Sequence, residues 1–76
     1  MTPELFKEKS TFIDMLAEAL DYDERSNVED IAYRYDPKFE DEYITIFFRG
    51  GGKKQILATG NSNGANAKEI INAIYG

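Results

Sequence analysis

The sequence predicts an α+β domain of the order α-β-β-β-α, in which a three-stranded antiparallel meander carries both helices on one face. Apolar residues recur at helical spacing near the two ends of the chain, within residues 13–20 and 67–74. Between these segments, residues 31–59 alternate between apolar and polar side chains as strands do. Short connections favour antiparallel neighbours, and a chain of 76 residues forms a single domain, residues 1–76.

The first helix is marked by its N-terminus and by one apolar stripe. Thr2 suits the N-cap position, and Pro3 suits the first helical position, where its missing N–H loses no hydrogen bond. The stripe consists of Ile13, Leu16, Ala17 and Leu20. Ser10 and Thr11 leave two alternatives open, because Thr11 can cap a fresh helical start. The helix is either continuous over about residues 3–20 or a short turn followed by a helix from about residue 11.

Three strands are predicted over about residues 31–36, 43–49 and 53–59. Pro37 ends the first strand because proline cannot donate a hydrogen bond to the sheet. The three glycines at 50–52 suit the turn between the second and third strands. The core face of the second strand carries Ile44, Ile46 and Phe48. The same alternation places Tyr43 and Phe47 on the opposite face, which the predicted architecture leaves uncovered.

The second helix has two candidate starts and a clear apolar stripe. Asn66 and Glu69 have the spacing of a capping box, and Asn63 is an alternative cap one turn earlier. The stripe consists of Ala67, Ile70, Ile71 and Ile74. The predicted core therefore consists of Ile13, Leu16, Leu20, Ile44, Ile46, Phe48, Ile56, Ile70, Ile71 and Ile74.

The passage from Thr59 to Lys68 has a Gly/Ser-rich turn followed by an Ala-Lys helix start. Together with the order α-β-β-β-α over about residues 12–75, this passage resembles the double-stranded RNA-binding domain. The resemblance implies the fold of that family. The family also places a basic pair after the serine, at the N-terminus of the second helix, where it holds RNA phosphates. Asn63 and Gly64 stand at those positions here, so the basic phosphate-binding motif is not retained.

Composition narrows the chemistry that the chain can perform. It has no cysteine and no histidine, so disulfides, thiol nucleophiles and the usual zinc ligands are excluded. No apolar run reaches the ~18–20 residues of a membrane span, and the N-terminus lacks the pattern of a signal peptide. We therefore expect a cytoplasmic, non-enzymatic protein with no catalytic residue, no cofactor, no metal site and no membrane partner.

Negative charge is concentrated in the middle of the chain. The net charge is −5, and residues 21–42 hold nine acidic side chains against three basic ones. Clustered carboxylates on a rigid domain favour docking on a basic protein surface and speed the encounter. The acidic partner-binding residues predicted on this basis are Asp36, Phe39, Glu40, Asp41 and Glu42. A solvated loop that keeps the protein soluble is the competing interpretation.

Tyr43 and Phe47 form the second predicted contact surface. Uncovered aromatic side chains on a sheet face are typical of a surface for another protein or for a second copy in a homodimer. The alternative is that the N-terminal segment with Leu5 and Phe6 covers them. The leading hypothesis is a small acidic protein-binding module, an inhibitor or adaptor that acts on a basic partner surface. Small phage and mobile-element proteins that block host nucleic-acid-handling proteins are the analogy.

A basic strip in the last third of the chain supports a second hypothesis. The strip consists of Arg49, Lys53, Lys54 and Lys68, and Glu69 is the one acidic residue after position 42. Lysine and arginine side chains of this kind contact phosphates, so the alternative function is a degenerate double-stranded RNA- or nucleic-acid-binding domain. Four charges give a weak, salt-sensitive contact, and lysines at a sheet edge also keep the edge soluble.

Overall fold

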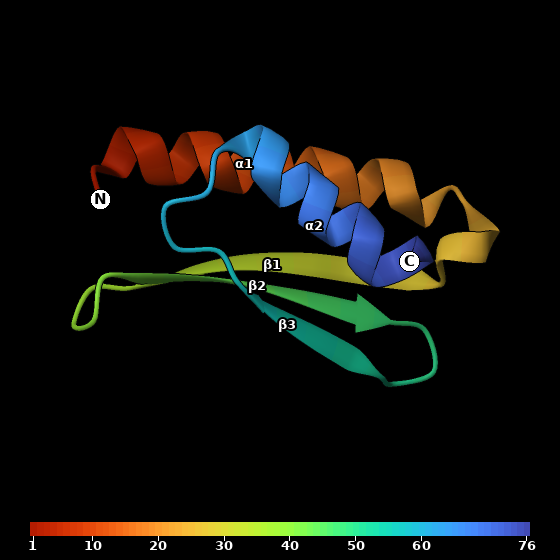
Figure 1. The fold of residues 1–76 in the computed structure, drawn as a ribbon. Coiled ribbons are helices and arrows are strands. Elements are labelled where there is room, and N and C mark those ends of the chain that lie inside the picture. Colours follow the sequence, from red (N-terminus) through yellow and green to blue (C-terminus); the bar gives the residue numbers. More distant parts are fainter.

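The computed structural model describes all residues 1–76 and has the predicted order of elements. These are helix α1 (Pro3–Asp21), the short 3₁₀ helix η1 (Glu24–Ser26), strands β1 (Val28–Asp36), β2 (Asp41–Phe48) and β3 (Lys53–Leu57), and helix α2 (Asn63–Tyr75). The strands form one antiparallel sheet in the order β1-β2-β3. Both helices lie on the same side of this sheet (Figure 1), which confirms the predicted α+β class. No helix combines the length and hydropathy that a membrane-spanning segment requires.

Helix α1 is continuous, which decides between the two alternatives for the N-terminal segment. It runs for 19 residues through Ser10 and Thr11 without a break. Its N-cap is Thr2, as predicted, and the Thr2 hydroxyl accepts a hydrogen bond from the Leu5 N–H at 3.1 Å. Ile13, Ala17 and Leu20 are buried on its inner face. Serine and threonine are tolerated in the middle of the helix because tertiary packing overrides their weak local preference.

Strand β1 begins earlier than alternation predicts. It starts at Val28 rather than near Ile31, and the pairing with β2 is irregular between Val28 and Asp30. The extra residue at this bulge leaves both Glu29 and Asp30 exposed, so the period of two is broken there. Strand β2 likewise begins at Asp41, two residues before the predicted start. Hydrophobic alternation does not predict these strand ends because their residues are charged.

The core lies between the sheet and the two helices. Its fully buried side chains include Ile13, Ile44, Ile46 and Ile70, all of which the sequence predicted. Five buried members are absent from the predicted core, namely Ala17, Val28, Ile31, Tyr33 and Ala58. The predicted members Leu16, Phe48, Ile56 and Ile74 are only partly buried. Ile71 is wrong as a core residue, because 37% of it is exposed on the outer side of α2.

Helix α2 starts one residue after a serine cap rather than at a capping box. Ser62 is the N-cap, and its hydroxyl accepts from the Ala65 N–H at 3.2 Å. The predicted caps at Asn66 and Asn63 are therefore wrong, because both residues lie within the helix. Asn66 is fully buried, and neither its amide nitrogen nor its amide oxygen has a hydrogen-bond partner.

Candidate functional site

The face of the sheet turned away from the helices is uncovered (Figure 1). Strand pairing brings Tyr43 beside Leu57 and Phe47 beside Lys53 on this open sheet face. Leu57 is 61% exposed and Phe47 is 37% exposed, whereas the alternating residues Ile44 and Ile46 are fully buried under the helices. Tyr43 and Phe47 thus lie on the uncovered face, as the alternation predicted.

The N-terminal segment does not cover this face. Phe6 lies on the helix side of the sheet, where its ring packs against the ring of Tyr33 with centroids 5.2 Å apart. Tyr33 is buried in the core between α1 and the sheet. The open sheet face therefore presents an apolar patch of Tyr43, Phe47 and Leu57 with no element of the chain packed on it.

Carboxylates border the patch. Asp36 and Asp41 pair across β1 and β2 next to Tyr43, and Asp30 pairs with Phe47 at the other end. The Tyr43 hydroxyl donates to Asp41 Oδ2 at 3.4 Å. Loss of solvation and the negative charge of Asp41 raise the pKa of the Tyr43 hydroxyl, so it stays a neutral donor.

The β1–β2 turn extends this surface beyond the end of the sheet. Phe39 is 66% exposed at the tip, and the Lys38 ammonium lies 5.3 Å from the centre of its ring. Glu40 is exposed and takes a positive φ of 54°, which closes the turn. The Asp36 carboxylate accepts from the Lys38 N–H at 2.9 Å and so fixes the start of the turn. Asp36 and Asp41 thus lie at the end of the open sheet face, and Phe39 and Glu40 are exposed in the turn next to them.

Glu42 does not belong to that surface, which corrects the prediction made for it. It is only 5% exposed, because it alternates with Ile44 and Ile46 and points toward the helices. Its Oε1 accepts from the Lys9 ammonium at 2.6 Å and from the Tyr33 hydroxyl at 2.7 Å. Its Oε2 accepts from the Gly60 N–H at 2.8 Å. A buried, fully bonded carboxylate is a structural group and cannot meet a partner.

Lys9 is the partner of Glu42 that the sequence did not predict. It lies on the inner face of α1 with a side chain only 9% exposed, and its ammonium pairs with Glu42 from 33 positions away. Lys9 stands on the same helical face as Ile13, four residues on, and that spacing is the only local signal of its burial.

The pKa values of Glu42 and Tyr33 follow from these contacts. Burial raises the pKa of the Glu42 carboxyl, but hydrogen bonds from Lys9, Tyr33 and the Gly60 N–H outweigh it, so the pKa is below its ordinary value. Burial and the same carboxylate raise the pKa of the Tyr33 hydroxyl. The ionised Glu42 carboxylate and the neutral Tyr33 phenol are therefore the stable forms at neutral pH.

This lowered pKa predicts a pH dependence of stability. A carboxyl whose pKa is lower in the folded chain stabilises it above the ordinary pKa, which is 4.5 for Glu42, and that contribution is lost as the pH falls through the folded value. We expect the difference in unfolding free energy between the wild type and Glu42→Gln to be constant from pH 7 to pH 5 and to shrink below it. Urea unfolding at a series of pH values measures this difference, and a difference that does not change with pH would contradict the assignment.

Two residues of the predicted basic strip bind other groups of the chain. The Arg49 guanidinium donates to the carboxylate of Asp21 and to its main-chain oxygen, the latter at 3.0 Å. The Lys54 ammonium donates to the carbonyl oxygen of Ala73 near the C-terminal end of α2 at 2.7 Å. Lys53 and Lys68 are exposed, and their ammonium groups make no ion pair or hydrogen bond within the chain. Two of the four residues of the predicted strip therefore have structural roles.

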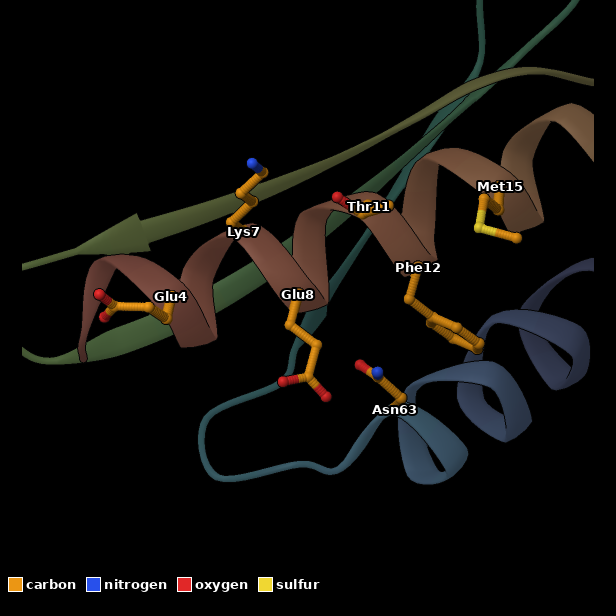
Figure 2. A pocket seen from close by; sticks show the side chains of 7 residues that line it. All are labelled: Glu4, Lys7, Glu8, Thr11, Phe12, Met15 and Asn63. Carbon is orange, nitrogen blue, oxygen red and sulfur yellow. The ribbon is translucent and has the colours of Figure 1, made fainter.

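Two grooves border helix α1. One, of about 480 Å³, lies between α1 and the start of α2, where Glu8, Phe12 and Asn63 approach one another (Figure 2). Its other lining residues are Glu4, Lys7, Thr11 and Met15. The second, of about 270 Å³, is lined by Asp14, Ala17, Glu18, Asp21, Glu29 and Asp30. In neither groove is a hydroxyl or an amine hydrogen-bonded to a carboxylate, and no group of three or more acidic side chains has the geometry of a metal site.

These features define a small α-β-β-β-α protein with an acid-bordered open sheet face and a buried Glu42–Lys9 ion pair. Comparison with protein-family models, with curated protein sequences and with solved structures finds no match. The element order is consistent with the predicted resemblance to the double-stranded RNA-binding domain but does not identify that family.

Proposed function

We propose that this chain is a cytoplasmic, non-enzymatic protein-binding module that docks its open sheet face on a basic partner surface, as an inhibitor or adaptor. The observation that supports this is the apolar patch of half-buried Tyr43 and exposed Phe47 and Leu57, with carboxylates at its border. An apolar centre with a polar rim is the usual anatomy of a protein–protein contact. The matching partner has an apolar patch ringed by lysine or arginine.

Two physical arguments favour such a partner. The aromatic side chains of Tyr43 and Phe47 are held on the central strand β2, so little conformational entropy is lost when they are buried. The charges of Asp30, Asp36 and Asp41 and the net charge of −5 steer the chain toward a basic surface. Arg34 and Lys53 on the same face provide points where acidic groups of the partner fit.

Capture of the partner from native lysate, followed by titration of the purified partner, tests the proposal. We expect Phe47→Ala to raise the dissociation constant by about tenfold or more, because aromatic residues at the centre of an interface dominate its energy. Met15→Ala is the matched control, since Met15 is an exposed apolar residue on α1, on the other side of the molecule. Equal losses for the two variants, or none for Phe47→Ala, would contradict docking through the open sheet face.

Charge variants give the second arm of this test. Asp36→Asn and Asp41→Asn are expected to slow association and to reduce its salt dependence, whereas Glu69→Gln on α2 is expected to leave both unchanged. The nucleic-acid hypothesis is tested in parallel with duplex RNA at low salt. Binding that weakens steeply with salt and is lost in Lys53→Glu and Lys68→Glu would favour that hypothesis over the protein partner.

A further inference from the structure

Strand β3 is an edge strand with unused main-chain groups. Its inner edge pairs with β2, where the Ala58 N–H donates to Glu42 O and the Phe48 N–H donates to Gly52 O, both at 2.8 Å. Residues along an antiparallel strand alternate in the direction of their N–H and C=O groups. The groups of Lys53, Gln55 and Leu57 therefore point away from the sheet.

We propose that two copies of this chain pair through β3 into a symmetric dimer with a continuous six-stranded antiparallel sheet. In the register centred on Gln55, each Gln55 exchanges two hydrogen bonds with its counterpart, and Lys53 pairs with Leu57 of the second copy. The outward groups on the two edges then form about six main-chain hydrogen bonds. Each copy uses the same strand edge, so the dimer leaves no β3 edge free for a further copy.

The side chains fit this register. Leu57 is 61% exposed and Ile56 is only partly buried, although both are apolar strand residues. Opposite them in the second copy stand Lys53 and Lys54, whose aliphatic stems cover apolar surface. The Lys53 ammonium reaches water, whereas the Lys54 ammonium stays bound to the Ala73 carbonyl of its own chain. The chain exposes 5052 Å², more than the roughly 4,700 Å² expected of a compact monomer of 8.6 kDa. Pairing through β3 buries part of this excess.

Like charges do not prevent the pairing. Lysines on an edge strand usually discourage it, but this register sets no lysine directly opposite another. The two Lys53 residues are about 14 Å apart along the joined strands. That separation exceeds the screening length of about 8 Å at physiological ionic strength. The Lys54 ammonium is turned onto α2 of its own chain, where it is bound to the Ala73 carbonyl.

The dimer also places the two open sheet faces side by side. Lys53 and Leu57 point to the same face as Tyr43 and Phe47 in each copy. The pairing thus joins two apolar patches into one longer surface. This inference does not depend on the proposed function, because its measurement requires no partner.

Sedimentation equilibrium of the full chain from micromolar to millimolar concentration tests the dimer. We expect a monomer–dimer equilibrium for the wild type and a monomer at every concentration for Gln55→Pro. Proline at position 55 removes an outward N–H and no bond within the chain, so circular dichroism is expected to show a retained fold. Gln55→Thr keeps the N–H and is the matched control, with dimerisation as in the wild type.

A charge swap tests the register without reliance on proline. Leu57→Lys sets two lysines opposite each other at both ends of the interface and is expected to weaken the dimer by roughly tenfold. Adding Lys53→Glu places opposite charges there and is expected to restore it. Met15→Lys and Lys68→Glu make the same charge changes away from β3 and are expected to have no effect. A monomeric wild type, a dimer that survives Gln55→Pro, or no recovery in the Leu57→Lys, Lys53→Glu variant would overturn the proposal.

Discussion

Replacing Glu42 with alanine is expected to lower the free energy of unfolding by about 3–5 kcal/mol. The variant leaves the buried Lys9 ammonium without its partner and removes the acceptor of the Tyr33 hydroxyl and the Gly60 N–H. Removing one partner of a buried ion pair destabilises the fold because the remaining charge is desolvated and has no compensating contact. Urea unfolding at neutral pH, followed by circular dichroism, measures the loss.

Two further variants separate the ion pair from a general effect of charge. Glu69→Ala removes the same charge from an exposed position on α2, and we expect it to change stability by no more than about 0.5 kcal/mol. The double variant Lys9→Met, Glu42→Gln removes both charges and keeps an acceptor for Tyr33, so it should be more stable than Glu42→Ala. A double variant as unstable as Glu42→Ala would show that the unpaired ammonium is not the cause.

The second large effect is expected at Ile70, which is fully buried on the inner side of α2. Ile70→Ala removes apolar contacts and leaves a cavity between α2 and the sheet, so we expect a loss of about 2–5 kcal/mol. A domain of this size has few core side chains, so the loss is a large fraction of its total stability. Thermal and urea unfolding both report it.

Ile71→Ala is the matched control, because it makes the same chemical change one residue further along the same helix. Ile71 is 37% exposed, so we expect its replacement to cost less than about half as much. Similar losses at the two positions would mean that α2 is rotated from its orientation in the structure, with Ile71 facing the core.

The fold could be predicted because its elements carry strong local signals. Thr2 and Pro3 mark the start of α1, and the alternation of Tyr43 with Ile44 divides the faces of β2. The start of β1 escaped prediction because the bulge at Glu29 breaks the alternation. The start of α2 was misplaced because Ser62, Asn63 and Asn66 all suit a cap, and the choice depends on the direction in which the chain leaves β3.

The surfaces were predicted less well, because charge in a sequence does not show which carboxylates meet solvent. Glu40, Asp41 and Glu42 are consecutive acidic residues, yet Glu40 is exposed at the turn and Glu42 is buried. The difference arises from the side of the strand on which each residue falls and from Lys9 on a distant helix. Arg49 was likewise assigned to a basic strip, although its partner Asp21 lies 28 positions away at the end of α1.

The three donors around Glu42 have a consequence for cooperativity. Lys9, Tyr33 and Gly60 come from α1, β1 and the segment that leads into α2, at separations of 33, 9 and 18 positions along the chain. Contacts between such distant segments form only after the intervening loops have closed. A partly assembled chain that lacks any one of these segments keeps a poorly compensated charge at the end of its central strand. This carboxylate therefore raises the free energy of partly folded forms and favours all-or-none folding of the whole chain.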